Sequence, residues 1–365
     1  MESLEVKQFK NIYFKKKVLI TGHNGFKGSW LNLWLKNLGA VTYGISDLKN
    51  HQNSFHFDLI SNHLNNFYFD LCNYSKTEKV INKIKPDIIF HLAAQPYVLT
   101  SLQEPHKTLY NNFLSTLNIL EIYRNLKFHS KLVLVTSDKV YENKNSNIPF
   151  NENDRLGGLD PYSCSKSVCE NIIKSYEHSF FSIMKKKGVA SVRAGNVIGG
   201  GDWGSNRIIP DYIKSIVNKK KLSVRSPESI RPWQYILDCL SGYLLVGQYL
   251  LEGKNLINCS WNFGPKKNSD ITVRYLIKKC NHIWSNKKVT FFNKNKFNES
   301  KFLKLSISKS KKQLGWKPIY DIDKSVFDTI NWYKSFFLDN QVKTNEQLNK
   351  YFQLAINKKT TWISN

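Results

Sequence analysis

The segment YSCSK contains a Tyr-x-x-x-Lys pair, Tyr162 and Lys166. Residues four apart lie on one face of a helix, where the lysine ammonium can lower the pKa of the tyrosine phenol. A tyrosinate held in this way can accept a proton from an alcohol while hydride leaves the same carbon. The chain contains this spacing five times, but only here does it closely follow a predicted core strand and stand behind a proline, Pro161, that can open a helix. We therefore predict that Tyr162 and Lys166 are catalytic.

A second segment, TGHNGFKG, places Gly22, Gly25 and Gly28 three residues apart between a predicted strand and a predicted helix. Glycine at such a turn lets the backbone approach a pyrophosphate closely, and the helix N-terminus supplies amide donors and a positive dipole. The alternative is an ordinary tight turn with good helix packing. The position after the first strand favours a dinucleotide site, so we assign the turn to a cofactor: Gly22, His23, Asn24, Gly25, Phe26 and Gly28. Within it we expect His23 to be a hydrogen-bonding loop residue and not a catalyst.

Two acidic residues are candidates for contacts to the adenosine half of the dinucleotide. Asp47 stands near the end of the second predicted strand, one or two residues later than the position that usually holds the ribose. Asp70 ends the third predicted strand, and we expect it to neighbour the adenine together with Leu71. The contact to the ribose is the weaker of these two assignments.

The third segment whose residue types could do chemistry is TSDKVY, at the carboxyl end of a predicted core strand. Ligands of open α/β sheets bind beyond the carboxyl ends of the strands. Ser137, Asp138 and Lys139 are therefore expected to point toward the place where Tyr162 lies. Asp138 and Lys139 form either a surface ion pair or, in a cleft, a proton donor and acceptor with shifted pKa values. We favour the second interpretation.

Alternating strands and helices position these residues. The predicted strands span 17–20, 40–46, 66–70, 87–93, 131–137 and 188–199, and the predicted helices 28–39, 108–126 and 162–186. This alternation predicts an α/β fold of the Rossmann type, with a doubly wound parallel sheet covered by helices on both faces. Beyond about residue 200 the alternation weakens. We therefore predict a dinucleotide-binding domain over 1–192 and a smaller C-terminal lobe over 193–365 that returns some chain to the core, with the polar last twenty-five residues loosely held.

The composition limits the function classes further. Among 365 residues, 54 Lys+Arg against 28 Asp+Glu leave a formal charge of 54 − 28 = +26, which suggests nucleic acid. The lysines are spread along the chain in short clusters, however, so we predict a generally basic surface and no nucleic-acid partner. No run of eighteen apolar residues and no signal-like start are present, and the six cysteines show no Cys-x-x-Cys pair. We expect a cytoplasmic protein with free thiols, no membrane contact and no metal.

Taken together, the segments resemble the extended short-chain dehydrogenase/reductase family of nucleotide-sugar enzymes, and within it the CDP-glucose 4,6-dehydratase subfamily. The similar segments occur in order between 17 and about 335: TGHNGFKGSWLNLWL, HLAAQP, VTSDKVYEN, GGLDPYSCSK, RAGNVIGGGDW, RPWQYIL, WNFGP and QLGWKP. The dTDP-glucose and GDP-mannose dehydratases of the family usually carry Asp–Glu where this chain has Asp138–Lys139. That pair and the His23/Lys27 form of the glycine turn are the discriminating residues.

The resemblance implies a redox cycle on NAD⁺ with no net oxidation. Tyr162 would deprotonate the C4 hydroxyl of the sugar as hydride passes to NAD⁺, with Ser137 bonded to the same oxygen and Lys166 holding the cofactor. The 4-ketone acidifies the C5 proton, so water can leave across C5–C6. Asp138 would protonate the departing hydroxyl, and Lys139 would either remove the C5 proton or only stabilise an enolate. Hydride then returns to C6.

The resemblance also implies the binding residues and an oligomeric state. Ala93, Ala94 and Gln95 would line the nicotinamide side of the site, with Asn112 stabilising the adjacent helix. The substrate phosphates would meet Asn196 and Arg231, and Arg207 and Asn262 are weaker substrate candidates. Trp203, Trp233 and Trp261 are expected to be core aromatics of the small lobe. Family members are commonly dimers through helices that correspond here to 108–126 and 162–186, so we expect a homodimer.

Three rival functions stay open at this stage. A nucleotide-sugar epimerase shares Tyr162, Lys166 and the glycine turn, and a 4,6-dehydratase acting on another nucleoside-diphosphate hexose shares all of the motifs. A non-catalytic NAD-binding regulator would keep the glycine turn but would not use Tyr162, Lys166 and Asp138 together. Their co-occurrence in one chain favours an enzyme, an NAD-dependent hydro-lyase. Cytidine as the base of the substrate follows from the resemblance alone.

Overall fold

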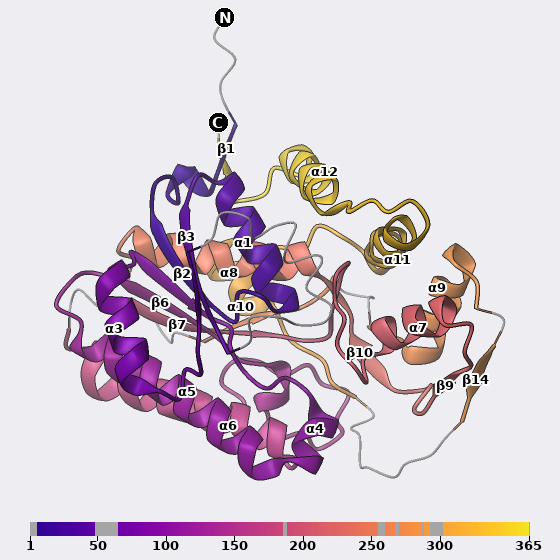
Figure 1. The fold of residues 1–365 in the computed structure, drawn as a ribbon, viewed down its shortest axis with the longest axis horizontal. Helices are drawn as coiled ribbons and strands as arrows, with labels where there is room; N and C mark the ends of the chain where they lie inside the picture. The colour runs from indigo at the N-terminus through magenta and orange to yellow at the C-terminus, as the bar shows by residue number, and fades with distance from the viewer. Residues whose placement is uncertain are drawn as a thin grey trace, which may run out of the picture.

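The computed structural model describes residues 6–47, 65–184, 188–254, 260–266, 270–286, 288–292 and 302–364. Its centre is a parallel sheet of seven strands in the order β12-β7-β6-β5-β2-β3-β4 (Figure 1). In chain order these strands are β2 (Lys17–Thr21), β3 (Val41–Ser46), β4 (Asn65–Tyr68), β5 (Ile88–His91), β6 (Lys131–Val135), β7 (Gly188–Ala194) and β12 (Ser260–Phe263). The order reverses between β2 and β5, which makes this the doubly wound α/β fold that the alternation predicts.

The inner strands are short runs of large apolar residues because both faces of the sheet are covered. In β2 and β5 the central side chains, Val18 to Ile20 and Ile88 to Phe90, have no exposed surface. All six predicted strands of the first half are confirmed. The last of them, predicted over 188–199, is divided into β7 and the short β8 (Val197–Ile198), which pairs with β11 (Gln234–Tyr235) and not with the main sheet.

Helices cover the two faces of the sheet (Figure 1). One face carries α3 (Tyr74–Ile84), α5 (Pro105–Asn125) and α6 (Pro161–Tyr176), and the other carries α1 (Phe26–Asn37) and α8 (Ile236–Leu251). Helix α6 ends earlier than predicted and continues as one π-helical turn, Glu177–Phe181. Helix α8, absent from the predicted elements, buries 14 of its 16 residues, as a central core helix does.

The smaller lobe is built from short elements on one side of the sheet (Figure 1). It contains α7 (Ile208–Val217), α9 (Val273–Ile283), and the strand pairs β9 (Leu222–Val224) with β14 (Val289–Phe291) and β10 (Ile230–Pro232) with β13 (Asp270–Thr272). The second half of the chain also returns to the main sheet, where β12 pairs with β7, and α10 (Ser308–Leu314) packs against β12. A division of the chain at 192 and 193 stays a prediction.

The expectation of a loosely held C-terminus is wrong. Residues after α11 (Ile322–Leu338) form α12 (Thr344–Asn357), whose Leu348, Tyr351 and Ala355 are buried at helical spacing. Trp362 is 2% exposed and stacks on Phe9 and Tyr351. Strand β15 (Ile363–Ser364) pairs antiparallel with β1 (Lys7–Gln8), so the two ends of the described chain lie side by side. The polar residues of this segment form only the outer face of a packed helix.

Two general properties complete the description of the fold. No helix in the described ranges is long and apolar enough to cross a membrane. The five cysteines in these ranges, at positions 72, 164, 169, 239 and 280, are free thiols. Three of them, Cys169, Cys239 and Cys280, are buried, and burial raises the pKa of each. As buried thiols with raised pKa values they act as small apolar core residues.

Candidate active site

A cleft of about 1140 Å³ lies at the carboxyl ends of the central strands. Parallel strands all end at this edge of the sheet, so segments far apart in the chain meet there. The lining includes the glycine turn after β2, the segments after β5 and β6, the start of α6, and parts of the smaller lobe. Most of the predicted site residues line this one cleft: Gly22, Asn24, Gly25, Phe26, Gly28, Asp70, Leu71, Ala93, Ala94, Gln95, Asn112, Ser137, Asp138, Lys139, Tyr162, Lys166, Asn196, Arg207 and Arg231.

The glycine turn leaves no room for side chains. Gly22 has φ +68°, and a Cβ there would lie 2.9 Å from the backbone of Ala93. A Cβ on Gly28 would lie 2.1 Å from the Gly22 carbonyl oxygen. Helix α1 begins at Phe26 without a side-chain cap, and its first residues, 26 to 29, line the cleft. A cradle of bare backbone at an uncapped helix N-terminus fits the pyrophosphate of a dinucleotide.

His23 belongs to the same turn but lies outside the lining of the cleft. Its ring is fully buried, tilted against Tyr68, and so close to β3 that a Cβ on Gly44 would lie 2.3 Å from it. Burial lowers the pKa of His23 to about 4, so the ring is neutral at pH 7. The structure therefore places His23 as a packing residue between the turn and β3, which leaves its assignment as a cofactor ligand without a contact surface.

The adenosine end of the cleft is formed by the ends of β3 and β4. Asp47 is exposed and Asp70 follows β4, and both line the cleft. The Asp70 carboxylate accepts a hydrogen bond from the backbone N–H of Cys72 (2.9 Å). The Ser46 hydroxyl donates to the side-chain oxygen of Asn24, which ties the end of β3 to the glycine turn. Two carboxylates at this rim are thus available to ribose hydroxyls.

The segment after β5 is held rigidly by one asparagine. Asn112 of α5 accepts a hydrogen bond from the backbone N–H of Gln95 (2.8 Å) and donates to its carbonyl oxygen (3.1 Å). It also donates to the Ser165 hydroxyl of α6 (2.9 Å). Asn112 therefore fixes Ala93, Ala94 and Gln95 against the helix that carries Tyr162.

The start of α6 presents Tyr162 and Lys166 to the cleft. Asp160 caps this helix by accepting the Ser163 backbone N–H (3.0 Å), and Pro161 occupies its first position. Burial raises the pKa of Tyr162 to about 12, while the Ser137 hydroxyl bond and Arg207 lower it. Burial and Lys27 lower the pKa of Lys166. By itself the protein therefore holds Tyr162 as a neutral phenol at pH 7, in contrast to the lowering predicted from the spacing.

A single turn of 3-10 helix, Asp138–Val140, follows β6, and Ser137 caps its N-terminus by accepting the backbone N–H of Lys139 (3.2 Å). Asp138 is 4% exposed; Ser137 donates to its Oδ1 (3.1 Å), and its Oδ2 has no hydrogen-bond partner among the described residues. Burial raises the pKa of Asp138, and the nearby Lys139, Ser137, Lys27 and Arg231 oppose that rise. A buried carboxyl that lines a cleft and has one oxygen without a hydrogen-bond partner among the described residues is suited to donate a proton.

The smaller lobe supplies polar groups to the other wall of the cleft. Arg207 forms an ion pair with Asp202 (2.9 Å) and lies over the Tyr97 ring, 5.0 Å from its centroid. Arg231 on β10 is 8% exposed and, like Asn196, lines the cleft. Guanidinium groups in a partly closed cleft suit the oxygens of a diphosphate.

Asn262 does not line this cleft. It lies on β12 with no exposed surface, accepts a hydrogen bond from the Tyr141 hydroxyl (2.7 Å), and donates to the carbonyl oxygen of Phe150 (3.0 Å). Both polar atoms of its side chain are thus occupied within the protein, and the structure brings no substrate surface to it. Asn262 belongs instead to a buried network with Tyr141 and Arg193.

The three tryptophans divide between two places. Trp261 is buried on β12 of the main sheet, outside the smaller lobe where it was expected. Trp233 is 4% exposed and Trp203 is half-buried against Tyr333 and Phe336, and both also line the cleft. These two are packed aromatics whose edges reach the cleft.

Among the lining residues without a predicted role are three with polar or charged side chains, Lys27, Tyr97 and Arg225. Lys27 lies on α1, with its Nζ 3.3 Å from the Tyr243 hydroxyl of α8, and it acts electrostatically on both Asp138 and Lys166. Tyr97 lies beneath Arg207, and Arg225 also lines the cleft. Lys27 could have been identified from the sequence, because it belongs to the His23/Lys27 form of the glycine turn, whereas Arg225 stands in no motif.

The sequence is similar to known nucleotide-sugar enzymes along most of its length. Residues 19–329 match the family described as GDP-mannose 4,6 dehydratase. CDP-glucose 4,6-dehydratase of Salmonella typhimurium is 37% identical over 333 residues, which cover 90% of this chain and 93% of that protein. dTDP-D-glucose 4,6-dehydratase of Dictyostelium discoideum is 28% identical, over 93% of this chain and 87% of its own.

Solved structures agree in fold. UDP-glucose 4-epimerase of Thermotoga maritima with UDP-glucose gives a TM-score of 0.77 at 19% identity, covering 87% of this chain and 99% of that one. dTDP-glucose 4,6-dehydratase of Bacillus anthracis in complex with NAD gives 0.73 at 20% identity, covering 88% and 97%. Epimerases and dehydratases thus share this architecture, and the fold alone does not separate them. The sequence matches go further: the chain belongs to the GDP-mannose 4,6 dehydratase family, within the extended short-chain dehydrogenases/reductases.

Proposed function

We propose that the protein is an NAD-dependent nucleotide-sugar 4,6-dehydratase that converts CDP-glucose to CDP-4-keto-6-deoxyglucose and water. The observation that carries the proposal is the meeting of three features in one cleft: a backbone cradle at Gly22 and Gly28, the pair Tyr162 and Lys166, and a buried carboxyl, Asp138, with an unbonded oxygen. The first two features serve any enzyme that moves hydride to and from a sugar. The third supplies the acid that elimination of water requires.

In the oxidation step, Tyr162 and Ser137 act on the C4 hydroxyl of the sugar. NAD⁺, when bound, supplies the hydride acceptor and later the hydride donor. Tyr162 takes the proton of the C4 hydroxyl, and Ser137 hydrogen-bonds the same oxygen. Because burial raises the pKa of Tyr162 to about 12, its ionisation near neutral pH requires added positive charge, from Lys166 and from the oxidised cofactor.

The elimination step uses the residues after β6. Asp138 protonates the departing C6 hydroxyl, and burial, which raises the pKa of this carboxyl, favours its proton-donating form. Lys139 lies one residue further along the same turn and removes the C5 proton or stabilises the enolate that forms. As hydride returns to C6, Lys139 or solvent gives a proton back to C5. Tyr162 releases to solvent the proton taken from the C4 hydroxyl, and Asp138 regains from solvent the proton that left with the water, so the cycle balances.

The choice of CDP-glucose over other nucleotide sugars is supported by two sequence observations. The Salmonella typhimurium relative at 37% identity is named for CDP-glucose, whereas the dTDP-D-glucose enzyme is 28% identical. The chain also carries Asp138–Lys139 where dTDP-glucose and GDP-mannose dehydratases usually carry Asp–Glu. In this proposal the phosphates of the substrate lie against Asn196, Arg207 and Arg231.

A substrate screen tests the proposal. The purified protein is incubated with NAD⁺ and, separately, with CDP-, dTDP-, UDP- and GDP-linked hexoses, and products are followed by mass spectrometry and by absorbance in alkali. We expect loss of one water from CDP-glucose and a keto product that absorbs in alkali. An isomer of unchanged mass would identify an epimerase, and water loss from a different nucleotide sugar alone would overturn the assignment of cytidine. Binding of NAD⁺ with no product from any of them would favour a regulator.

We also propose a homodimer that forms through α5 and α6, in a reducing compartment such as the cytoplasm. Helices α5 and α6 pack side by side, and α5 exposes the apolar side chains of Leu109 and Tyr110. Light scattering during size-exclusion chromatography measures the mass directly. Leu109→Asp with Tyr110→Asp should convert the dimer to a monomer, whereas a monomeric wild type would overturn this part of the proposal.

A further inference from the structure

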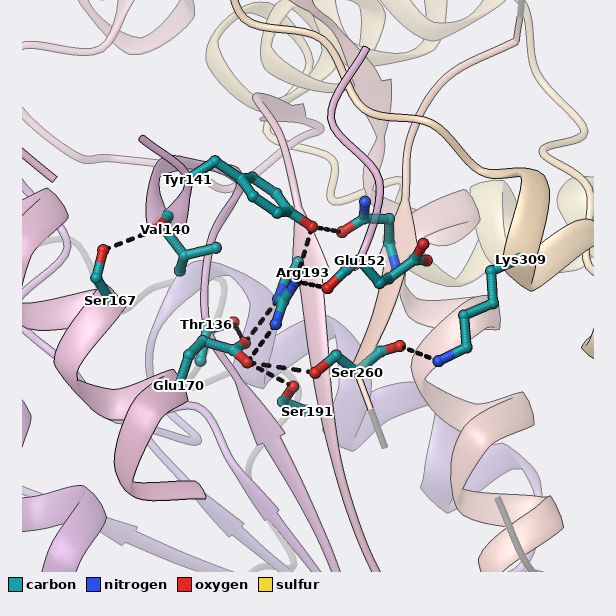
Figure 2. A network of polar contacts seen from close by, with 11 residues as sticks. Thr136, Val140, Tyr141, Glu152, Ser167, Glu170, Ser191, Arg193, Ser260 and Lys309 are labelled. Carbon is teal, nitrogen blue, oxygen red and sulfur yellow. Dashed lines mark hydrogen bonds and ion pairs between the residues drawn. The ribbon is translucent and has the colours of Figure 1, made fainter. Parts of the chain in front are cut away.

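A buried ion pair lies behind the active site, between α6 and β7 (Figure 2). Arg193 donates to both carboxylate oxygens of Glu170, from Nε to Oε1 (2.9 Å) and from Nη2 to Oε2 (2.6 Å). Neither side chain has any exposed surface, and neither residue lines the cleft. The two residues thus make no contact with a ligand of the cleft. They can affect the cleft only through residues that they bond to.

The carboxylate of Glu170 contacts the start of the segment 136–141, which carries the proposed catalytic residues Ser137, Asp138 and Lys139. Thr136 directly precedes Ser137, and its hydroxyl donates to Glu170 Oε1 (2.5 Å). Glu170 itself lies four residues after Lys166 and eight after Tyr162, on the same face of α6. One carboxylate therefore joins the helix that carries Tyr162 to the strand end that carries Ser137 and Asp138.

The guanidinium of Arg193 reaches the other end of the segment. Its Nη1 donates to the Tyr141 hydroxyl (2.8 Å), which in turn donates to Asn262 on β12. The Ser167 hydroxyl of α6 adds a bond to the carbonyl oxygen of Val140 (2.8 Å). The residues from Ser137 to Lys139 are thus held at both ends by one ion pair, and all three line the cleft.

We infer that Glu170 and Arg193 are positioning residues that keep the segment 136–141 in a fixed position relative to Tyr162. The hydrogen bond from the Thr136 hydroxyl to Glu170 fixes the adjacent Ser137 and Asp138. The inference rests on the proposed function for its activity readout. Charge-assisted hydrogen bonds in a buried site are short and directional, so they define position closely. Misplacement of a catalytic group by about 1 Å can cost 10²-fold in rate.

A pair of single substitutions separates positioning from mere stability. Thr136→Val keeps the shape and the methyl group but removes the hydroxyl that donates to Glu170. Ser191→Ala is the matched control, because Ser191 on β7 donates to the same carboxylate (3.0 Å) but carries no catalytic segment. We expect Thr136→Val to lower kcat about 10- to 100-fold with KM changed less than threefold, Thr136→Ser to restore kcat to within threefold, and Ser191→Ala to leave it within twofold of wild type.

A second readout needs no substrate. Amide hydrogen exchange of 137–141 in the NAD-loaded protein should become at least tenfold faster in Thr136→Val and stay unchanged in Ser191→Ala. Equal losses of kcat in the two variants, or unchanged kcat and exchange in Thr136→Val, would overturn the inference. If the wild type does not convert CDP-glucose, the proposed function fails, and the exchange experiment still decides whether the hydroxyl holds the segment.

Discussion

Two buried carboxylates, Asp138 and Glu170, lie near the end of β6 and differ in what surrounds them. Glu170 accepts hydrogen bonds from Thr136, Ser191 and Arg193, whereas Asp138 accepts one from Ser137 and has a second oxygen without a partner. Burial raises the pKa of both, but for Glu170 the Arg193 charge and the hydroxyl bonds outweigh burial and lower its pKa. Burial alone therefore does not make a carboxyl a functional acid. The carboxyl must also lack the charges and hydrogen bonds that would offset the rise in pKa caused by burial.

Removing the uncompensated acid is expected to have the largest effect on activity. Asp138→Asn keeps the shape of the side chain but cannot donate its proton, so kcat for water elimination should fall on the order of 10²- to 10⁴-fold. NAD⁺ affinity and the free energy of unfolding should stay close to wild type, because Oδ2 has no bond to lose. Fluorescence titration and urea unfolding check both controls. Intact turnover would remove Asp138 from the mechanism.

Removing the compensated carboxylate is expected to have the largest effect on stability. Glu170→Gln leaves Arg193 charged and buried without a counterion, which costs about 3–5 kcal/mol of unfolding free energy. The control is Glu121→Gln, which breaks the partly exposed pair with Arg124 and should change stability too little to resolve. Urea denaturation at pH 7 measures both. Equal effects in the two variants would contradict the difference drawn between the buried and the exposed pair.

The lowered pKa of Glu170 predicts how stability responds to acid. A carboxyl whose pKa is lower in the folded state contributes stability that is fully present above its ordinary value of 4.5 and is lost as pH falls through the folded pKa. Unfolding free energy should therefore decline below pH 4.5, and less steeply in Glu170→Gln. Denaturation at a series of pH values tests this, and an identical slope in the variant would refute the assignment to Glu170.

A third buried carboxylate, Asp238 of α8, gives the smallest and most specific prediction. It accepts bonds from the backbone of Ile319 (2.6 Å) and Tyr320 (3.1 Å) and from the Tyr351 hydroxyl (2.7 Å), and burial raises its pKa to about 6. The folded state thus binds more protons, and stability should fall as pH rises from 3.8 to about 6, by on the order of 3 kcal/mol at about 1.4 kcal/mol per pH unit. Asp238→Asn should abolish this slope in calorimetric scans across that range.

Local patterns predicted the first half of the fold well. The buried strands were visible as short apolar runs, and the end of α1 was visible at Gly39, whose φ is +73°. Helix α8 was missed because it is buried on nearly all sides, so its largely apolar sequence shows little helical periodicity. Helix α12 was missed because only its thin buried stripe, Leu348 to Ala355, is apolar in an otherwise polar segment.

The predicted site shows a similar division. The residues of the glycine turn and of the segments after β5 and β6 line one cleft, because every parallel strand ends at the same edge. Asn262 was assigned to the substrate from resemblance alone, yet its side chain bonds to Tyr141, which is 121 residues away in the chain. Lys27 and Tyr243 meet across 216 residues, and no local pattern reports such a contact.

By itself, the sequence determined which chemical groups are present and which of them share a helix face or a turn. Tyr162 and Lys166 share a helix face, and Gly22 and Gly28 share a turn, because local backbone geometry converts their spacing into these positions. The tertiary structure alone decided the protonation states and the supports of these groups. Those depend on burial and on charges brought together from distant segments, as when Arg193 meets Glu170 and nothing meets Asp138 Oδ2 within the described chain.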